Sequence, residues 1–100
     1  MDKIFHIAKI RDWDEARGKG SYAPGDFSEI GFIHCCYRQQ LSGVIERYFL
    51  GQGDFILLTI SKDEIKETCR DEISTGGEFF PHVYSRIPLS AILNVEKVTC

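Results

Sequence analysis

The sequence lacks several features that would place it in a specialised class of proteins. No apolar run approaches the roughly 18 residues of a membrane-spanning helix, and the opening MDKIFHIAKI has no secretory-signal pattern. We therefore expect a cytoplasmic protein that does not insert into a membrane. The four cysteines follow no regular spacing, so in a reducing compartment we expect free thiols rather than a disulfide framework. They are Cys35, Cys36, Cys69 and Cys100.

A concentration of charge of one sign is also missing. Twelve basic residues stand against fifteen acidic ones, and neither sign forms a run longer than two or three positions. This balance excludes the basic surface that binds bulk nucleic acid, although recognition of a single nucleotide or a strand end stays open. The chain has no repeat, linker or low-complexity tract, and 100 residues suffice for one hydrophobic core. We expect a single domain over 1–100.

Apolar segments predict about five strands. KIFHIA and DFILLTI are apolar on both faces, which is typical of strands that are covered on both sides. Pro81 cannot donate a ladder hydrogen bond, so the strand around it should lie at a sheet edge or be interrupted there. The final strand is charged and should be peripheral. The predicted strands are 3–8, 31–36, 54–60, 79–87 and 94–99.

Capping patterns and apolar periodicity predict helices between these strands. Asp12 with Glu15 resembles a capping pair, and Gly18 would end the short helix. The stretch 18–26 then reads as a loop. The clearest helix is 39–50, where apolar residues recur at helical spacing and should pack on a sheet.

Weaker helical signals follow in the second half of the chain. Ser61 with Glu64 forms a second capping pattern and predicts a helical turn around 65–69. A glycine pair at 76–77 predicts a turn, and a proline favours a brief helix over 88–92. Strands and helices alternate irregularly, which indicates an α+β fold with a small mixed or mostly antiparallel sheet and short helices packed against it.

All three histidines lie inside strand-like apolar segments. They are His6 in IFHIA, His34 in FIHCC and His82 in FPHVY. One strand histidine is readily explained as a core residue whose nitrogens bond a backbone carbonyl and a hydroxyl. Three such residues each need their own partners, and leucine or phenylalanine would pack better. We therefore predict that the three imidazoles meet at one shared cleft.

The residues leave three uses of such a cleft open. Three imidazoles, joined by Cys36, suit zinc with an open fourth position, although no pair has the short spacing of familiar zinc sites. A nucleotide or sugar-phosphate pocket would use imidazoles for ribose, aromatic rings for stacking and arginine for phosphate. Hydrolysis by Cys35 or Cys36 with a histidine is weaker, because no helix start lowers a thiol pKa there. Residues near the histidines that could serve a nucleotide are Tyr22, Tyr37, Tyr84, Arg38 and Arg86.

Several motifs, in order over almost the whole chain, resemble the DUF952 family. The most specific blocks are GFIHC and FPHVY. The family is named for its unknown function, and it is similar to a compact ADP-ribosyltransferase fold, whose members include RNA 2′-phosphotransferases. The matching features are IFHIA, Trp13 seven residues after the histidine, G-x-Y at 20–22, GFIHCC followed by Gln40, DFILLTI, Glu72 and FPHVYSRIPLSAI.

The resemblance implies roles for individual residues. In the transferases a histidine on the first core strand holds a ribose hydroxyl of NAD, and His6 matches it. His34 matches the position beside the nicotinamide, and His82 matches a third position on a later strand. Glu72 matches the glutamate that precedes the F-P-H block and is the acidic catalytic candidate. The implied reaction breaks the nicotinamide–ribose bond.

The resemblance also implies a ligand and its contacts. NAD is the implied cofactor, with no metal, and the acceptor would be an RNA or a protein. Cys36 replaces the familiar serine after GFIHC and Ser85 replaces a glycine, so a hydroxyl contact at 36 is lost while the pocket shape is kept. An inactive nucleotide- or metabolite-binding module, a three-histidine metal site and a pure interaction domain are the alternatives. The expected ligand contacts are Trp13, Tyr22, Cys36, Gln40 and Tyr84.

Overall fold

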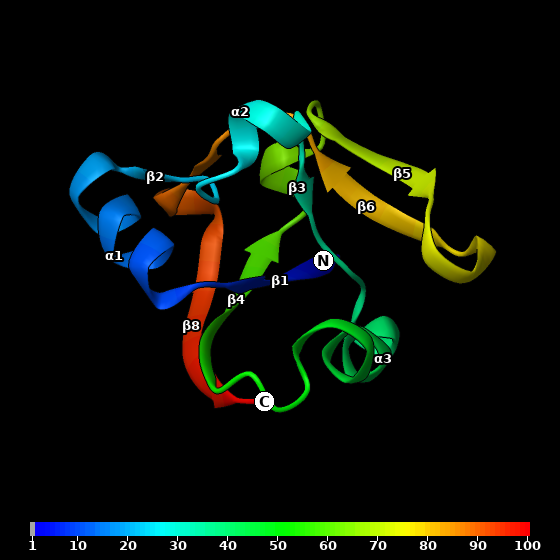
Figure 1. Ribbon diagram of the computed structural model, residues 1–100. Helices are drawn as coiled ribbons and strands as arrows, with labels where there is room; N and C mark the ends of the chain where they lie inside the picture. The colour runs from blue at the N-terminus through cyan, green and yellow to red at the C-terminus, as the bar shows by residue number, and fades with distance from the viewer. Residues whose placement is uncertain (1) are drawn as a thin grey trace.

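Two three-stranded antiparallel sheets form the body of the molecule (Figure 1). The structure is a computed structural model and describes residues 2–100. The radius of gyration of 12.6 Å is close to the ~13 Å expected of a compact chain of this length. The fold is α+β, as predicted, and every strand pairing among the described residues is antiparallel.

The first sheet has the order β1-β4-β8. Strand β4 is central and buries side chains on both faces, which confirms the prediction from its continuous apolar run. Leu57 belongs to one hydrophobic cluster and Leu58 to the other, because neighbouring residues of a strand point to opposite faces. Strand β8 is an edge strand and mostly exposed, also as predicted. The strands are Lys3–Ala8, Asp54–Ser61 and Ile92–Thr99.

The second sheet has the order β3-β6-β5. Strand β3 is shorter than the predicted strand 31–36, and β6 ends before the predicted 87. The helical turn predicted around 65–69 is confined to Asp63–Ile65, and strand β5, which was not predicted, begins at Cys69. The hairpin β5–β6 turns through a 3₁₀ turn at Thr75–Gly77, which contains the predicted glycine turn. The strands are Ile33–His34, Phe79–Val83 and Cys69–Ile73.

Of the two alternatives predicted for the strand around Pro81, the position at a sheet edge is wrong, because β6 is the middle strand, whereas the interruption at the proline is confirmed on one side. The Pro81 carbonyl accepts a hydrogen bond from the Cys35 N–H at 3.1 Å, on the side of β3. In a strand, the N–H and C=O of one residue point to the same side, so the missing donor also faces β3. Pairing between β3 and β6 ends one residue earlier, at His34 and His82. The proline therefore interrupts the β3 side and leaves the β5 side complete.

A third, two-stranded pairing was not predicted. Strand β2, Ser21–Tyr22, lies in the predicted loop 18–26 and pairs with β7, Ile87–Pro88. The Arg86 side chain reinforces this pairing through hydrogen bonds to Ser21. The pairing holds Tyr22 completely buried in the core.

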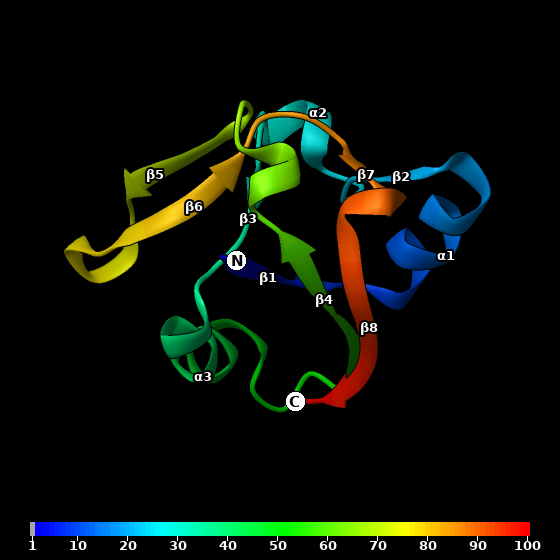
Figure 2. The same cartoon turned by 180° about the vertical axis from the view of Figure 1, so that it is seen from behind.

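Helix α1, Ile10–Lys19, begins and ends at other residues than predicted. Its N-cap is Lys9, so the proposed cap Asp12 lies inside the first turn with a buried side chain. It continues through Gly18 to Gly20, whose φ of 80° and N–H bond to the Ala16 carbonyl end the helix. Figure 2 shows α1 and the β5–β6 hairpin at opposite ends of the molecule.

The predicted helix 39–50 is helical almost throughout, but its geometry changes along its length. A 3₁₀ turn at Arg38–Gln40 leads into α3, Leu41–Val44, and a π-helical segment at Ile45–Phe49 follows. Its apolar residues pack on β1 and β4, as expected. A short α2 at Phe27–Ile30 precedes β3, and a 3₁₀ turn at Leu89–Ala91 confirms the brief predicted helix there. Among residues 2–100, no helix is long and apolar enough to cross a membrane.

Candidate functional site

The three histidines line one cavity of about 580 Å³. His6 comes from β1, His34 from β3 and His82 from β6. Backbone hydrogen bonds of 2.8 Å in both directions between Phe5 and Cys36 fasten β1 to the chain just after β3. His34 and His82 are direct partners in the β3–β6 register. The predicted convergence of the three imidazoles at one cleft is thus what the structure shows.

His6 is buried and has both ring nitrogens bonded within the protein. Nδ1 lies 2.6 Å from the His34 carbonyl oxygen, and Nε2 lies 2.8 Å from the Tyr22 hydroxyl. Because a carbonyl can only accept, Nδ1 carries the hydrogen, and Tyr22 must donate to Nε2. Burial lowers the pKa of His6 to about 4, so the ring is neutral at physiological pH. This neutral tautomer fixes the direction of the Tyr22 hydroxyl.

Tyr22 belongs to the cavity lining and is a fully buried residue. Since its hydrogen is directed at His6, the hydroxyl oxygen can otherwise act only as an acceptor. Burial raises the pKa of Tyr22, so the phenol stays protonated. Tyr22 was predicted as a ligand contact, and the structure places it in the cavity.

His34 is the exposed member of the three. Partial burial, and then the positive charge that neighbouring His82 can carry, lower its pKa, so the neutral ring is favoured. The ring packs edge-on against Phe32, with 4.7 Å between ring centroids. His34 therefore offers ring nitrogens to a ligand while its backbone carbonyl holds His6.

His82 is buried between an aromatic ring and a carboxylate. Its ring stacks on Phe32 at 4.2 Å, and its Nδ1 donates to Glu72 Oε1 at 2.7 Å. Nε2 is buried and has no hydrogen-bond partner among residues 2–100. Most buried polar atoms in folded proteins are paired. An unpaired one on a residue of the cavity lining is therefore a candidate contact for a ligand atom.

Glu72 lies behind His82 rather than on the cavity wall. Its carboxylate accepts hydrogen bonds from Tyr84 and from His82, and these bonds, in that order, lower the pKa of Glu72. Tyr84 is exposed and is likewise absent from the cavity lining. The bond to Glu72 is the main cause that raises the pKa of Tyr84. Glu72 and Tyr84, both predicted as site residues, thus hold the His82 ring in place.

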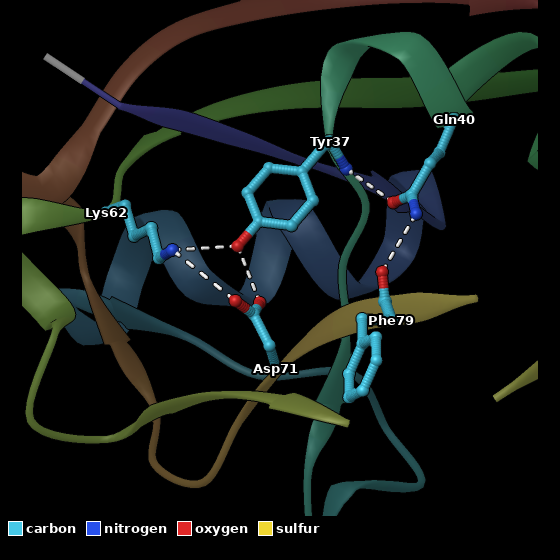
Figure 3. Close-up of polar contacts among 5 residues, drawn as sticks. All are labelled: Tyr37, Gln40, Lys62, Asp71 and Phe79. Carbon is cyan, nitrogen blue, oxygen red and sulfur yellow. Dashed lines mark hydrogen bonds and ion pairs between the residues drawn. The ribbon is translucent and has the colours of Figure 1, made fainter. Parts of the chain in front are cut away.

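The remaining predicted contacts divide between the cavity and its surroundings. Cys36 lines the cavity, whereas Trp13 packs against the hydrophobic core 6.5 Å from the Tyr22 ring. Gln40 is also outside the cavity lining, and its side chain bonds the Tyr37 N–H at 2.9 Å and the Phe79 carbonyl at 2.9 Å (Figure 3). Gln40 therefore ties the start of its helix to β6.

A second polar network fastens β5 from the side (Figure 3). Tyr37 donates to Asp71 Oδ1 at 2.5 Å and accepts from Lys62 Nζ at 2.7 Å. Lys62 and Asp71 are also 3.8 Å apart as an ion pair. Tyr37, Arg38 and Arg86, considered as nucleotide contacts from the sequence, are absent from the cavity lining.

Several cavity residues were not identified from the sequence. Near α1 the wall carries charges of both signs, including the carboxylate of Asp12, which is 5% exposed and 3.8 Å from Arg11 Nε. Near α3 and the hairpin turn it is largely apolar, with hydroxyls of Tyr48 and Thr75 that bond each other. Tyr48 lies in the predicted helix 39–50, whose apolar residues were expected to pack on a sheet. Its place at helical spacing concealed its 48% exposure, and Asp12 was misread as a cap.

The thiols are poorly suited to nucleophilic chemistry. Burial raises the pKa of Cys36 to about 12 and raises that of Cys35 as well, so both stay protonated. A three-histidine metal site also has no support. Among residues 2–100, no group of three histidine, cysteine or acidic side chains is arranged to hold a metal ion.

The chain matches a known protein family over most of its length. The model of the family described as "Protein of unknown function (DUF952)" matches residues 7–95. The chain belongs to the DUF952 family. No curated protein matches the chain. The sequence resemblance to this family is thereby confirmed.

Solved structures of protein CC0527 from Caulobacter crescentus share the fold of this DUF952 chain. The crystal structure is 26% identical, with a TM-score of 0.84, and the match covers 97% of this chain and 84% of that chain. The solution NMR structure is 28% identical, with a TM-score of 0.81, over 96% of this chain and 84% of that one. The α+β arrangement is therefore shared with an experimentally determined protein.

Proposed function

We propose that the cavity binds NAD or a related nucleotide and that the protein transfers ADP-ribose, or a related group, to an acceptor. The observation that carries this proposal is the convergence of three imidazoles from three strands on a cavity of about 580 Å³. This volume lies within the ~300–1,000 Å³ range of small-molecule sites. The resemblance of the DUF952 pattern to a compact ADP-ribosyltransferase fold supports the choice of nucleotide.

The polar wall supports a role in ribose binding. The Tyr22 hydroxyl oxygen accepts a hydrogen bond from a ribose hydroxyl, because its own hydrogen is committed to His6. His34, exposed beside it, bonds a second hydroxyl or the carboxamide. Both nitrogens of His6 are engaged, so His6 acts through Tyr22 and the His34 backbone. Such fixed groups position a ligand at little entropic cost.

The opposite wall supports a role in holding a flat ring. Phe49, Phe80 and Val44 supply apolar surface, and the nearby hydroxyls of Thr75 and Ser74 supply hydrogen bonds to ring substituents. An apolar cavity with a few placed polar groups is typical of cofactor sites. The ends of the cavity thus match a molecule with a hydroxyl-rich part and an aromatic part.

A binding module without transfer is the second candidate. The observation that favours it is the position of Glu72, the acidic catalytic candidate, outside the cavity lining. Such a module would bind the nucleotide with the same wall and release no nicotinamide.

One experiment separates the two candidates. Purified protein is titrated with NAD in a thermal-unfolding assay, and nicotinamide is then measured with water, an RNA oligonucleotide and a 2′-phosphorylated RNA oligonucleotide as acceptors. We expect a rise in melting temperature, because a ligand that binds only the folded state stabilises it. We also expect nicotinamide release with at least one acceptor. Binding without release supports the module, and no binding overturns both.

Variants test whether the cavity is responsible. Tyr22→Phe and His34→Ala each remove one proposed ligand contact, and we expect each to weaken NAD binding by roughly tenfold, the value of one good hydrogen bond. Asn94→Ala, on the exposed edge strand β8, is the matched control and should bind as the wild type does. Equal affinity of all four proteins would place NAD elsewhere.

A further inference from the structure

We propose that His82 is the general base of the transfer and that Glu72 is its positioning residue, so that the acceptor is a hydroxyl group. This inference rests on the proposed function, since it assigns the proton of the incoming acceptor. Neither the family description nor the related structures assign a role to these residues.

The hydrogen-bond geometry fixes the tautomer of His82. Glu72 Oε1 lies 2.7 Å from Nδ1, and a carboxylate can only accept, so Nδ1 carries the hydrogen. In the neutral imidazole the other nitrogen, Nε2, then presents a lone pair. A carboxylate that holds one imidazole nitrogen and leaves the second free is the arrangement that orients a general base and stabilises the imidazolium it becomes.

The position of Nε2 indicates what it meets. Glu72, on the Nδ1 side, is outside the cavity lining, whereas the His82 ring is part of it. Nε2 lies across the ring from Nδ1 and is buried without a partner among the described residues. A lone pair in that place is satisfied by a donor that arrives with a ligand. A carbonyl or carboxylate is not such a donor, whereas a hydroxyl is, and a hydroxyl is also the donor that most needs a base to take its proton as it attacks.

Neighbouring side chains hold the ring in one orientation. Phe32 stacks on it at 26° between ring planes, and the His34 ring meets it edge-on at 5.4 Å between centroids. Glu72 is anchored by a second bond from Tyr84. These contacts limit rotation of the imidazole, which is what a base needs to stay within reach of one proton.

The chemical step balances with the residues present and NAD as substrate. The acceptor oxygen attacks the anomeric carbon, and its O–H bond breaks with the proton going to His82 Nε2. The bond from that carbon to nicotinamide breaks, and its electron pair leaves with nicotinamide. A new C–O bond joins acceptor and ADP-ribose. The imidazolium, paired with the Glu72 carboxylate, later returns its proton to solvent, and no oxidant or reductant is needed.

The test measures nicotinamide release at saturating NAD with water and with methanol as small hydroxyl acceptors. We expect His82→Gln to lower kcat by at least about 100-fold, the usual scale of general-base catalysis. Glu72→Gln should lower kcat by at least about tenfold and leave KM for NAD unchanged. Glu96→Gln is the matched control, because this carboxylate on the exposed edge strand β8 bonds Asn94 instead of His82 and should leave kcat unchanged. Methyl ADP-ribose, detected by mass spectrometry, should appear with methanol.

The pH profile separates a base from a merely structural residue. General-base catalysis gives the wild-type rate an acid limb, and this limb should disappear in His82→Gln. Charged and titratable groups around the ring are Glu72 and Arg70 on β5, His34 on β3, and Tyr84. His34→Ala should therefore keep the acid limb, whereas loss of the limb in that variant instead of His82→Gln overturns the assignment.

Failure of this inference can be told apart from failure of the proposed function. If the wild-type protein releases nicotinamide and His82→Gln releases it equally fast, the base assignment is wrong and the transfer function stands. If the wild type neither binds nor cleaves NAD, the proposed function fails. Independently, ¹⁵N NMR of labelled histidine should find the Nδ1–H tautomer of His82 at neutral pH. A proton on Nε2 instead would overturn the dyad without any assay of turnover.

Discussion

At the scale of residues, the histidines differ in what their nitrogens are free to do. Both ring nitrogens of His6 form hydrogen bonds within the protein, whereas in His82 only Nδ1 does so and Nε2 has no partner among the described residues. His34 is exposed to the cavity. One amino-acid type thus supplies a fixed support, a candidate base and a candidate ligand contact. The difference lies in their partners, which come from other parts of the chain.

The buried state of His6 predicts a pH-dependent stability. Its pKa is lowered from 6.5 to about 4, so between these values the unfolded chain binds more protons than the folded one. The stability that His6 contributes should therefore be fully present above pH 6.5. It should fall as the pH drops, by about 2 kcal/mol at pH 5. The lowered pKa of His34 adds a slope of the same sign. Urea denaturation between pH 7 and pH 5 measures this change.

A variant isolates the His6 contribution. His6→Gln should be less stable at pH 7 and should show a flatter dependence of unfolding free energy on pH than the wild type. His34→Ala is the comparison, since it removes the weaker of the two titrations. NMR titration of the His6 ring in the wild-type protein measures its pKa directly. A His6 signal that titrates near pH 6.5 would contradict the geometry.

At the scale of elements, the β5–β6 hairpin is fastened to the body by side chains rather than by a long sheet. β3 pairs with β6 through only two residue positions. Gln40 and the Tyr37–Lys62–Asp71 network connect the hairpin to the segment after β3, and Tyr48 bonds the hairpin turn at Thr75. Because the hairpin carries His82 and Thr75, these side chains set the width of the cavity.

Gln40→Ala should loosen the hairpin. The variant loses the bonds to the Tyr37 N–H and the Phe79 carbonyl, each worth about 0.5–1.5 kcal/mol, so we expect a loss of about 1–3 kcal/mol in unfolding free energy. Hydrogen exchange of the β6 amides should become faster than in the wild type. Gln39→Ala is the matched control, an exposed glutamine one residue earlier. Similar exchange rates in both variants would show that Gln40 does not hold β6.

Elements differ in how far the sequence determines them. The strands 3–8 and 54–60 were predictable because a short segment that is apolar on both faces is stable as a strand only when both faces are covered. β2 and β7 are two residues each and exist because they pair with each other across 65 positions of sequence. No local pattern reports such a pairing. β5 is mostly exposed and polar, so its strand state depends on β6.

At the scale of the whole molecule, the convergence of the histidines could be predicted, but their bonding could not. The apolar segments around the histidines predicted that each imidazole lies on a strand. The cost of burying three imidazoles separately favoured one shared site. The partners Tyr22 and Glu72 lie on elements whose placement follows from long-range pairing. Asp12 was misassigned because a capping residue and a buried cavity carboxylate have the same sequence pattern. The residue roles that the family resemblance implies stay predictions.

The two hydrophobic clusters should unfold together, because β1 and β4 contribute side chains to both. Leu57→Ala removes apolar volume from the cluster beside α3 and should cost about 2–5 kcal/mol. Trp13, the only tryptophan, packs against the other cluster and reports on it by fluorescence.

We expect the fluorescence and far-UV circular dichroism transitions of Leu57→Ala to coincide and to shift equally from those of the wild type. Leu58→Ala, on the opposite face of the same strand, should behave alike with a similar cost. If the Trp13 transition of Leu57→Ala stays at the wild-type denaturant concentration, the clusters unfold independently. The cavity, whose wall draws on both clusters, would then open before the chain unfolds, and ligand binding would protect only part of the molecule.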